Sequence, residues 1–128
     1  MTDSPPYPAI AVANFFLSRA QEEGEPVSQL KLQKLVYFAH GWHLAIEGEP
    51  LIEERIEAWQ FGPVVHNIYR KAKKYGRDPI PEKLDGNLYP DAPEDAEIPT
   101  SDTSTRGLLN RVWESYKNYT AGQLSAMT

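Results

Sequence analysis

Three histidines, His40, His43 and His66, are the side chains in this sequence best suited to acid, base or metal chemistry near neutral pH. His40 and His43 are three positions apart and would share one face of a helix, with Glu47 four positions after His43. Such a group can begin a metal site, with His66 or Glu47 as a further ligand. The HExxH pattern and cysteine ligands are absent, so structural histidines explain the spacing better. We expect no bound metal and no other cofactor.

Other catalytic arrangements are not found in the sequence. Ser and Thr residues concentrate at positions 100–105, but no G-x-S-x-G turn surrounds a serine and no glycine-rich phosphate loop occurs. Glu53, Glu54 and Glu57 form an acidic cluster around Arg55. Such mixed charges are typical of a solvated surface rather than of a catalytic acid and base pair. We therefore expect that the protein is not an enzyme.

The segment WQFGPVV at 59–65 places two aromatic side chains and a Gly-Pro pair in one short turn. In the simplest interpretation, Trp59 and Phe61 belong to the core of a tight turn. In the alternative, the turn is an exposed anchor for a partner, because aromatic residues are enriched in the hot spots of protein interfaces. Both interpretations can hold for different residues of the turn.

A basic stretch at 70–77 contains five Lys and Arg residues and directly follows Tyr69. At the end of a helix these cations complement the helix dipole, but they can also contact RNA, DNA or an acidic protein. The net charge of −5 opposes non-specific nucleic-acid binding, and no helix-turn-helix or RNA-binding signature occurs. We do not expect nucleic acid as the main partner, and a nucleic-acid-binding regulator that uses 70–77 remains an alternative function.

The chain has 128 residues, and its length supports a single domain with one core. The absence of cysteine excludes disulfides and thiolate chemistry. No apolar run approaches the ~20 residues of a membrane span, and the N-terminus lacks the basic and apolar parts of a signal peptide. We expect one cytoplasmic domain over 1–128 that has no membrane contact.

Helical periodicity predicts the elements that position these residues. Ile10–Glu23 carries apolar residues at spacings of three and four. A second helix is predicted from Gln29 to about Glu47, with Ser28 as its N-cap and an end at Gly48. Its apolar face leaves two lysines pointing away from the core; these are Lys31 and Lys34.

Three further helices are predicted over 63–75, over 103–118 and from 121 onward. Pro63 suits the first position of a helix, because its missing N–H would be unpaired there in any case. Thr103 or Ser104 is the expected N-cap of the next helix, and Thr120 with Gln123 has the spacing of a capping box. The segment 56–61 is expected to be a short extended stretch.

The remaining stretches carry many prolines and little helical periodicity. Residues 1–8 are expected to be a flexible arm, and 77–102 is expected to be a long Pro-rich, acidic surface connection. Three apolar residues can pin this connection to the body; these are Ile80, Leu84 and Leu88. The fold class predicted is an all-α, single-domain bundle of four to five helices. Its predicted core contains Leu32, Leu35, Phe38, Ala39, Trp42, Ile68, Val112 and Trp113.

Two blocks of the sequence, taken together, resemble a known family. The first is LKLQKLVYFA at 30–39 with GWHLA at 41–45, and the second is IEAW at 56–59 with FGPVV at 61–65 and Tyr69. These blocks resemble the Panacea domain, the family of SocA-like antitoxins and the phage-associated protein GepA. The family continues past its last helix start with a segment that contains His and Trp, which is absent here. We therefore expect that the native chain can extend beyond Thr128.

The resemblance implies an antitoxin of a toxin–antitoxin system, which neutralises a toxin from a neighbouring gene by direct protein–protein binding. It also implies an alternative, an adaptor that delivers a toxin to an AAA+ protease. From the residues, the candidates for partner contact are the aromatic turn, the two lysines of the second helix and part of the basic stretch. These are Trp59, Phe61, Pro63, Tyr69, Lys31, Lys34, Arg70, Lys73 and Lys74.

Overall fold

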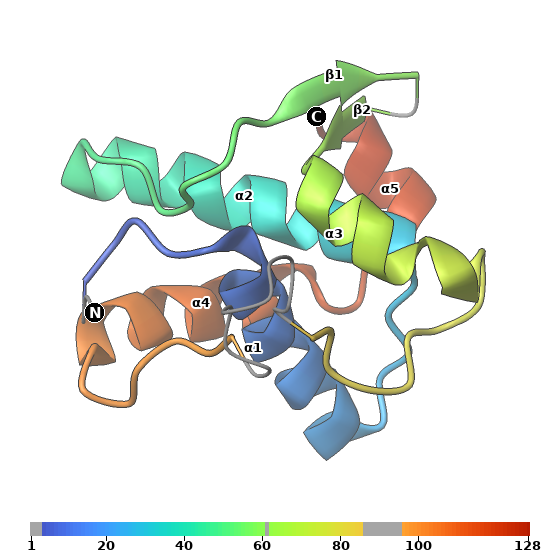
Figure 1. The fold of residues 1–128 in the computed structure, drawn as a ribbon, viewed down its shortest axis with the longest axis horizontal. Helices are drawn as coiled ribbons and strands as arrows, with labels where there is room; N and C mark the ends of the chain where they lie inside the picture. Colours follow the sequence, from blue (N-terminus) through green and yellow to red (C-terminus); the bar gives the residue numbers. More distant parts are fainter. Residues whose placement is uncertain (1–3, 61, 86–95) are drawn as a thin grey trace.

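The computed structural model describes residues 4–60, 62–85 and 96–128 and shows a mostly helical protein with a two-stranded antiparallel sheet (Figure 1). The predicted helical fold is confirmed, and β1 lies inside the segment that we expected to be extended. In chain order the elements are α1 (Ala9–Glu23), α2 (Gln29–Glu47), β1 (Glu57–Trp59), β2 (Gly62–Val64), α3 (His66–Ala72), η1 (Lys73–Tyr75), α4 (Thr103–Tyr116) and α5 (Ala121–Ala126).

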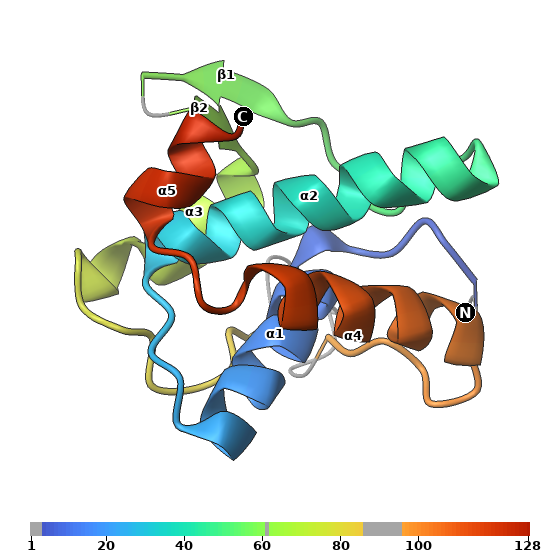
Figure 2. The same cartoon turned by 180° about the vertical axis from the view of Figure 1, so that it is seen from behind.

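Helix α2 is the central element of the fold and contacts every other α-helix as well as β2. Its N-terminus forms as predicted, because the Ser28 side chain accepts a hydrogen bond from the Lys31 N–H at 3.3 Å. The helix ends at Gly48, also as predicted. From behind, α4 runs alongside α2 and α5 lies close to the hairpin formed by β1 and β2 (Figure 2).

The core lies between α1, α2 and α4. Phe16 of α1 stacks on Trp113 of α4 with ring centroids 6.5 Å apart, and both side chains are fully buried. Six predicted core residues are buried, which confirms them; these are Leu32, Leu35, Ala39, Ile68, Val112 and Trp113. Phe38 is half-buried and stacks on Tyr116.

The prediction that Trp42 belongs to the core is wrong, because its side chain is 49% exposed. Its indole N–H donates to the Tyr116 hydroxyl at 3.0 Å, at the edge of the contact between α2 and α4. The periodicity of α2 assigned Trp42 to the inner face, but in this turn the buried residue is the next one, His43.

The prediction of a loose N-terminal arm is wrong for its described residues. Tyr7 is buried, and its backbone pairs with the 51–53 segment through two hydrogen bonds of 2.8 and 2.9 Å. Its hydroxyl donates to the Asp102 carboxylate at 2.5 Å. Burial opposes ionisation of Asp102, but hydrogen bonds from Tyr7 and Thr105 lower the pKa of this carboxyl overall. The arm is therefore tied to two distant parts of the chain.

The connection between η1 and α4 is fixed to the body at both of its described ends. Ile80 and Leu84 are buried as predicted, whereas Leu88 lies outside the described residues. The buried Asn14 amide accepts from the Leu84 N–H and donates to the carbonyls of Leu84 and Ala96 at 2.7 to 3.0 Å. Asp102, and not the predicted Thr103 or Ser104, caps α4 by accepting from the Thr105 N–H.

Pro63 does not begin a helix, contrary to the prediction. It lies in β2 opposite Ala58 of β1, and the helix begins three residues later at His66. The fifth helix begins as predicted, with the Thr120 and Gln123 side chains forming a reciprocal capping box.

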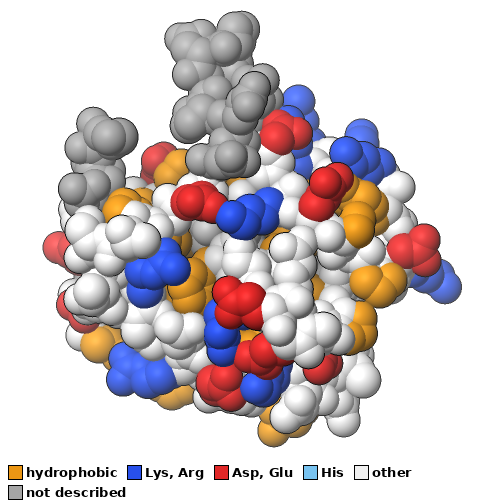
Figure 3. Space-filling view, turned by 90° about the horizontal axis from the view of Figure 1, so that it is seen from below, with side chains coloured by type: hydrophobic (Ala, Val, Ile, Leu, Met, Phe, Trp, Pro, Cys, Tyr) orange, Lys and Arg blue, Asp and Glu red, His pale blue; other side chains and the backbone are white. Residues whose placement is uncertain are grey.

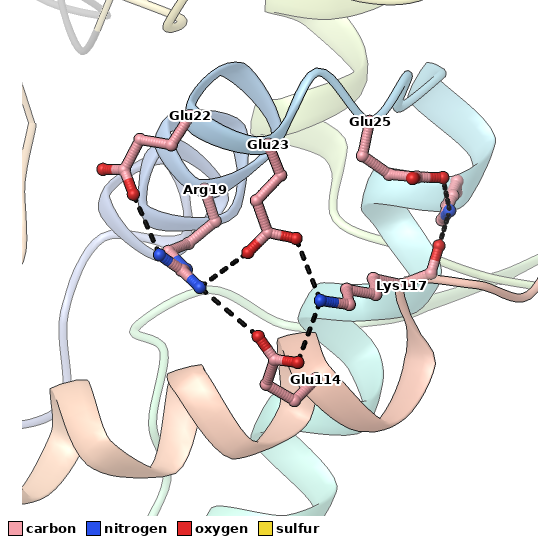
Figure 4. A network of polar contacts seen from close by, with 7 residues as sticks. Arg19, Glu22, Glu23, Glu25, Glu114 and Lys117 are labelled. Carbon is pink, nitrogen blue, oxygen red and sulfur yellow. Dashed lines mark hydrogen bonds and ion pairs between the residues drawn. The ribbon is translucent and has the colours of Figure 1, made fainter.

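Charges at the ends of α1 and α4 form a surface network (Figure 4). Arg19 contacts Glu22, Glu23 and Glu114, and Lys117 contacts Glu23 and Glu114, at 2.7 to 3.4 Å. Each such exposed pair contributes about 0–1 kcal/mol. Acidic and basic side chains are likewise interspersed over the face seen from below in Figure 3.

Candidate partner-binding groove

An open groove with a volume of about 810 Å³ lies between the first turn of α2, the β1–β2 hairpin, α3 with η1, and the start of α5. Figure 1 shows the hairpin, α3 and α5 gathered around one end of α2. Among the predicted contact residues, Trp59, Tyr69 and Lys73 line this groove. Leu30 and Gln33 of the first sequence block also line it, so the structure brings the two blocks together at one groove.

Trp59 and Tyr69 form an aromatic wall of the groove. Their rings meet edge to face with centroids 4.9 Å apart, and the His66 ring lies 6.1 Å from Trp59. The indole N–H of Trp59 donates to the Glu57 carboxylate at 3.0 Å, and 37% of the Trp59 side chain is exposed. An edge-to-face pair adds about 0.5–1.5 kcal/mol beyond its buried area. The wall therefore holds an exposed aromatic surface in one orientation.

Gln33 fixes the junction between the hairpin and α3 from inside the protein. Its buried side chain accepts from the Val65 N–H at 2.9 Å and donates to the Val65 carbonyl at 3.1 Å. These bonds satisfy the backbone of Val65 just before the first turn of α3. Because buried backbone groups must be paired, Gln33 stabilises the extended conformation that we had expected to be helical.

Lys34 lies beneath the hairpin and is fully buried. Its Nζ is so close to Gly62 that a Cβ there would collide with it. Gly62 also has a φ of 112°, which L side chains rarely adopt. Burial lowers the pKa of Lys34 below the ordinary lysine value of 10.5. The prediction that Lys34 points away from the body is wrong, because β2 and α5 pack against α2 here.

Lys31 is also buried, with 6% of its surface exposed, which corrects the prediction for this residue too. Its ammonium group donates to the Lys117 carbonyl at the end of α4 and lies 3.9 Å from the Glu25 carboxylate (Figure 4). Burial lowers the pKa of Lys31, and Glu25 partly opposes this effect. A cation at a helix C-terminus also stabilises the helix dipole. Lys31 therefore connects α2 to α4.

The basic stretch supplies the charged rim of the groove. Lys73 and Arg77 line it and are exposed. Arg70 and Lys74 are exposed nearby on the same stretch, and the Lys74 Nζ lies 5.2 Å from the centre of the Tyr75 ring. Arg70 lies in the last turn of α3, and Lys73 and Lys74 lie in η1 directly after it, so these cations complement the C-terminal end of the helix, in agreement with the simpler interpretation of the sequence.

The two remaining candidates, Pro63 and Phe61, have different outcomes. Pro63 is half-buried in β2 and does not line the groove. Phe61 lies outside the described residues.

Sequence reasoning missed the contribution of the first turn of α2. Ser28, Gln29 and Leu30 line the groove, together with Val64 of β2 and Ala121 of α5. Leu30 offered a signal, because it falls on the opposite side of the helix from Leu32 and is still apolar. An apolar residue off the core face can indicate a second contact surface.

The three histidines make local contacts instead of gathering at one point. His40 Nδ1 accepts from the Leu51 N–H at 3.3 Å, and His43 Nδ1 lies 2.7 Å from the Glu49 carbonyl. His66 packs against the aromatic wall. Burial lowers the pKa of His40, and the neighbouring His43 lowers it further. Within the described residues, no three His, Asp or Glu side chains are grouped as metal ligands.

A second apolar hollow, of about 240 Å³, lies between the C-terminal half of α2 and α4. Trp42 and Ile46 of α2 and Tyr116 of α4 line it. Ile46 is 55% exposed, so this face also presents apolar surface. The two hollows share no lining residue.

Among the described residues, none of the helices has the length and apolar character needed to cross a membrane.

Comparisons with known proteins agree with the resemblance inferred from the two sequence blocks. The family described as "Antitoxin SocA-like, Panacea domain" matches residues 32–128. A curated relative, Antitoxin SocA from Caulobacter vibrioides (strain NA1000 / CB15N), is 52% identical over 62 residues. This match covers 48% of the present chain and 33% of the relative, so the chain matches about a third of the relative's length. No solved structure matches the chain.

The family match includes the hairpin, α3 and all of the basic stretch, and it extends through α5. This protein belongs to the antitoxin SocA-like, Panacea domain family.

Proposed function

We propose that this protein is the antitoxin of a toxin–antitoxin system and neutralises the product of a neighbouring gene by binding it directly through the groove. The observation that carries the proposal is the exposed aromatic wall of Trp59 and Tyr69, which lies within the family-matched residues and lines an open groove. A half-exposed Trp beside a hollow is the kind of anchor that dominates binding energy in protein interfaces.

The internal contacts of the groove support the same function. Gln33 hydrogen-bonds the Val65 backbone at the junction between the hairpin and α3, and the buried Lys34 packs against Gly62 of β2. A rigid binding surface loses less conformational entropy when a partner binds, so affinity is higher for the same contact area. The buried polar residues of α2 therefore contribute to binding indirectly, through the shape of the groove.

A growth assay tests this function. The neighbouring gene is expressed alone, with this protein, and with its Trp59→Ala variant, in a host that lacks its main AAA+ proteases. We expect toxicity of the neighbour alone, rescue by the wild type, and loss of rescue with Trp59→Ala. Loss of a hot-spot aromatic costs about 2 kcal/mol or more of binding free energy, which is roughly thirtyfold in Kd.

Trp42→Ala is the matched control for this assay. Trp42 is the other exposed Trp, also has its indole N–H hydrogen-bonded, and lies outside the groove. We expect it to rescue growth like the wild type, with both variants folded by circular dichroism. Rescue that occurs only when the proteases are present would support an adaptor instead, and a harmless neighbour would overturn the antitoxin proposal.

A further inference from the structure

The charged side chains that line the groove are both cations, Lys73 and Arg77. Within the described residues, no carboxylate lines the groove and neither of these cations makes an ion pair. Elsewhere, Arg19 and Lys117 each contact two or more carboxylates (Figure 4). In a chain with a net charge of −5, this groove is therefore lined by two cations that form no ion pair with a described carboxylate.

The remainder of the lining is apolar or neutral. Leu30, Val64 and Ala121 join the aromatic wall, and Gln29 and Gln60 add amides that can donate and accept hydrogen bonds. The cations lie on the α3 and η1 side of the groove, where Arg70 and Lys74 extend the positive surface. An apolar hollow with one positively charged rim is complementary to an apolar side chain with neighbouring carboxylates.

We infer that the groove accepts an acidic segment of a partner protein, in which one apolar or aromatic side chain is flanked by Asp or Glu residues. This inference rests on the proposed function and specifies the chemistry of the partner at the same site. The apolar side chain packs against Trp59 and Tyr69, and the carboxylates pair with Lys73 and Arg77. Pairing at the rim increases the association rate and selects against basic partners.

A polyanion such as RNA fits these observations less well. Nucleic-acid affinity rises with the number of phosphates that the protein neutralises, and only two cations line the groove. The net charge of −5 also repels a long anionic chain more than it repels a short acidic peptide. RNA would share two features with the peptide, because bases can stack on Trp59 and Tyr69 and phosphates can pair with the two cations.

The first test uses probes that do not depend on the identity of the toxin. Short peptides with a central Phe, Leu or Trp between Asp and Glu residues are titrated into the full chain, and the Trp59 indole N–H resonance is followed by NMR. Matched peptides carry Asn and Gln, or Lys and Arg, in place of the acids, and a short single-stranded RNA is the nucleic-acid probe. We expect the acidic set to bind at least about tenfold more tightly than the neutral set, with weaker binding at high salt.

The second test uses the product of the neighbouring gene and a charge-reversed double variant, Lys73→Glu with Arg77→Glu. We expect this variant to weaken binding by about tenfold or more and to remove most of its salt dependence. The control is Arg55→Glu with Arg111→Glu, which changes the net charge equally at two exposed cations outside the groove. We expect the control to change Kd by less than about threefold, and circular dichroism confirms that both variants fold.

Each failure has a distinct meaning. If the gene product binds but charge reversal at the groove has no more effect than the control, the acidic-segment inference is wrong while direct binding stands. If the acidic peptides bind at Trp59 but the gene product does not, the groove chemistry stands and the antitoxin function fails. If the neutral or basic peptides or the RNA bind more tightly than the acidic peptides, the inference is overturned.

Discussion

The two halves of α2 differ in the side chains that they bury. The N-terminal half buries polar side chains; these are Lys31, Gln33 and Lys34. The C-terminal half exposes apolar side chains; these are Trp42, Leu44 and Ile46. These six residues depart from the usual rule that apolar residues lie inside and charged residues outside, whereas Leu32, Leu35 and Ala39 of the same helix follow it.

The surroundings of each half explain this difference. In the N-terminal half, the hairpin, α3 and α5 pack on sides of α2 that the α1 contact leaves open. A polar group enclosed there must be hydrogen-bonded, since an unpaired buried group costs about 1–3 kcal/mol. Gln33 and Lys31 meet this condition through backbone partners. In the C-terminal half the hairpin and α5 are absent from the surroundings, and one face of the helix stays exposed.

The largest effect is expected from Gln33→Leu, which places an apolar residue of similar size in the buried N-terminal half. The substitution leaves the Val65 N–H without its partner and removes one of two hydrogen bonds to the Val65 carbonyl, which still accepts from the Tyr69 N–H at 3.1 Å. We expect a loss of about 2–4 kcal/mol in the free energy of unfolding, because the unpaired buried N–H costs about 1–3 kcal/mol and the second lost hydrogen bond about 1 kcal/mol. Urea denaturation followed by circular dichroism measures this loss. A neutral or stabilising result would show that the hydrogen bonds between Gln33 and Val65 do not contribute to stability.

The next largest loss in the free energy of unfolding is expected from Gly62→Ala, which tests the contact between the hairpin and Lys34. Alanine at a φ of 112° is strained, and strain of this kind costs about 1–3 kcal/mol. Collision of the new Cβ with the Lys34 ammonium adds to this cost.

A double-mutant cycle with Lys34→Ala separates the two contributions to the Gly62→Ala effect. We expect Gly62→Ala to cost less in the Lys34→Ala background, by about 0.5 kcal/mol or more, because only backbone strain remains. Equal costs in both backgrounds would mean that Lys34 yields without penalty.

A smaller change in the free energy of unfolding is expected when the pH is raised. Burial lowers the pKa of Lys34 below 10.5, so the unfolded chain binds more protons than the folded protein in the window below 10.5. The contribution of Lys34 to the free energy of unfolding therefore rises as pH rises through that window. It is lowest at pH values where Lys34 is protonated in both the folded and the unfolded state. Lys34→Met removes this dependence. We expect the stability of the wild type relative to Lys34→Met to increase between pH 8 and pH 10, and a constant or falling difference would contradict the burial effect.

The sequence predicted the bounds of α2 but not the orientation of its polar residues. Ser28 and Gly48 act locally, so their effect on the helix ends can be predicted without the rest of the fold. The burial of Lys34 depends on β2 and α5, which come from distant parts of the chain. The spacing of apolar residues identifies only one buried face of a helix, whereas the N-terminal half of α2 is buried on more than one face.

The candidate site was predictable to a similar extent. Aromatic content indicated Trp59 and Tyr69, and clustering indicated Lys73, because these signals belong to single segments. The groove itself also needs the first turn of α2 and the start of α5. Neither segment carries an aromatic or charged residue in the groove that would have distinguished it from an ordinary helix end.

The smallest effect is expected from Leu44→Gln in the C-terminal half of α2, the reverse of Gln33→Leu within the same helix. Leu44 is 42% exposed, and Leu and Gln have similar helix propensities. We expect the free energy of unfolding to change by less than about 0.5 kcal/mol. If Leu44→Gln costs as much as Gln33→Leu, the C-terminal half is also enclosed in solution, and the difference between the two halves does not hold. If Leu44→Gln changes the free energy of unfolding little and Gln33→Leu changes it strongly, the neighbouring elements decide which residues of α2 are buried.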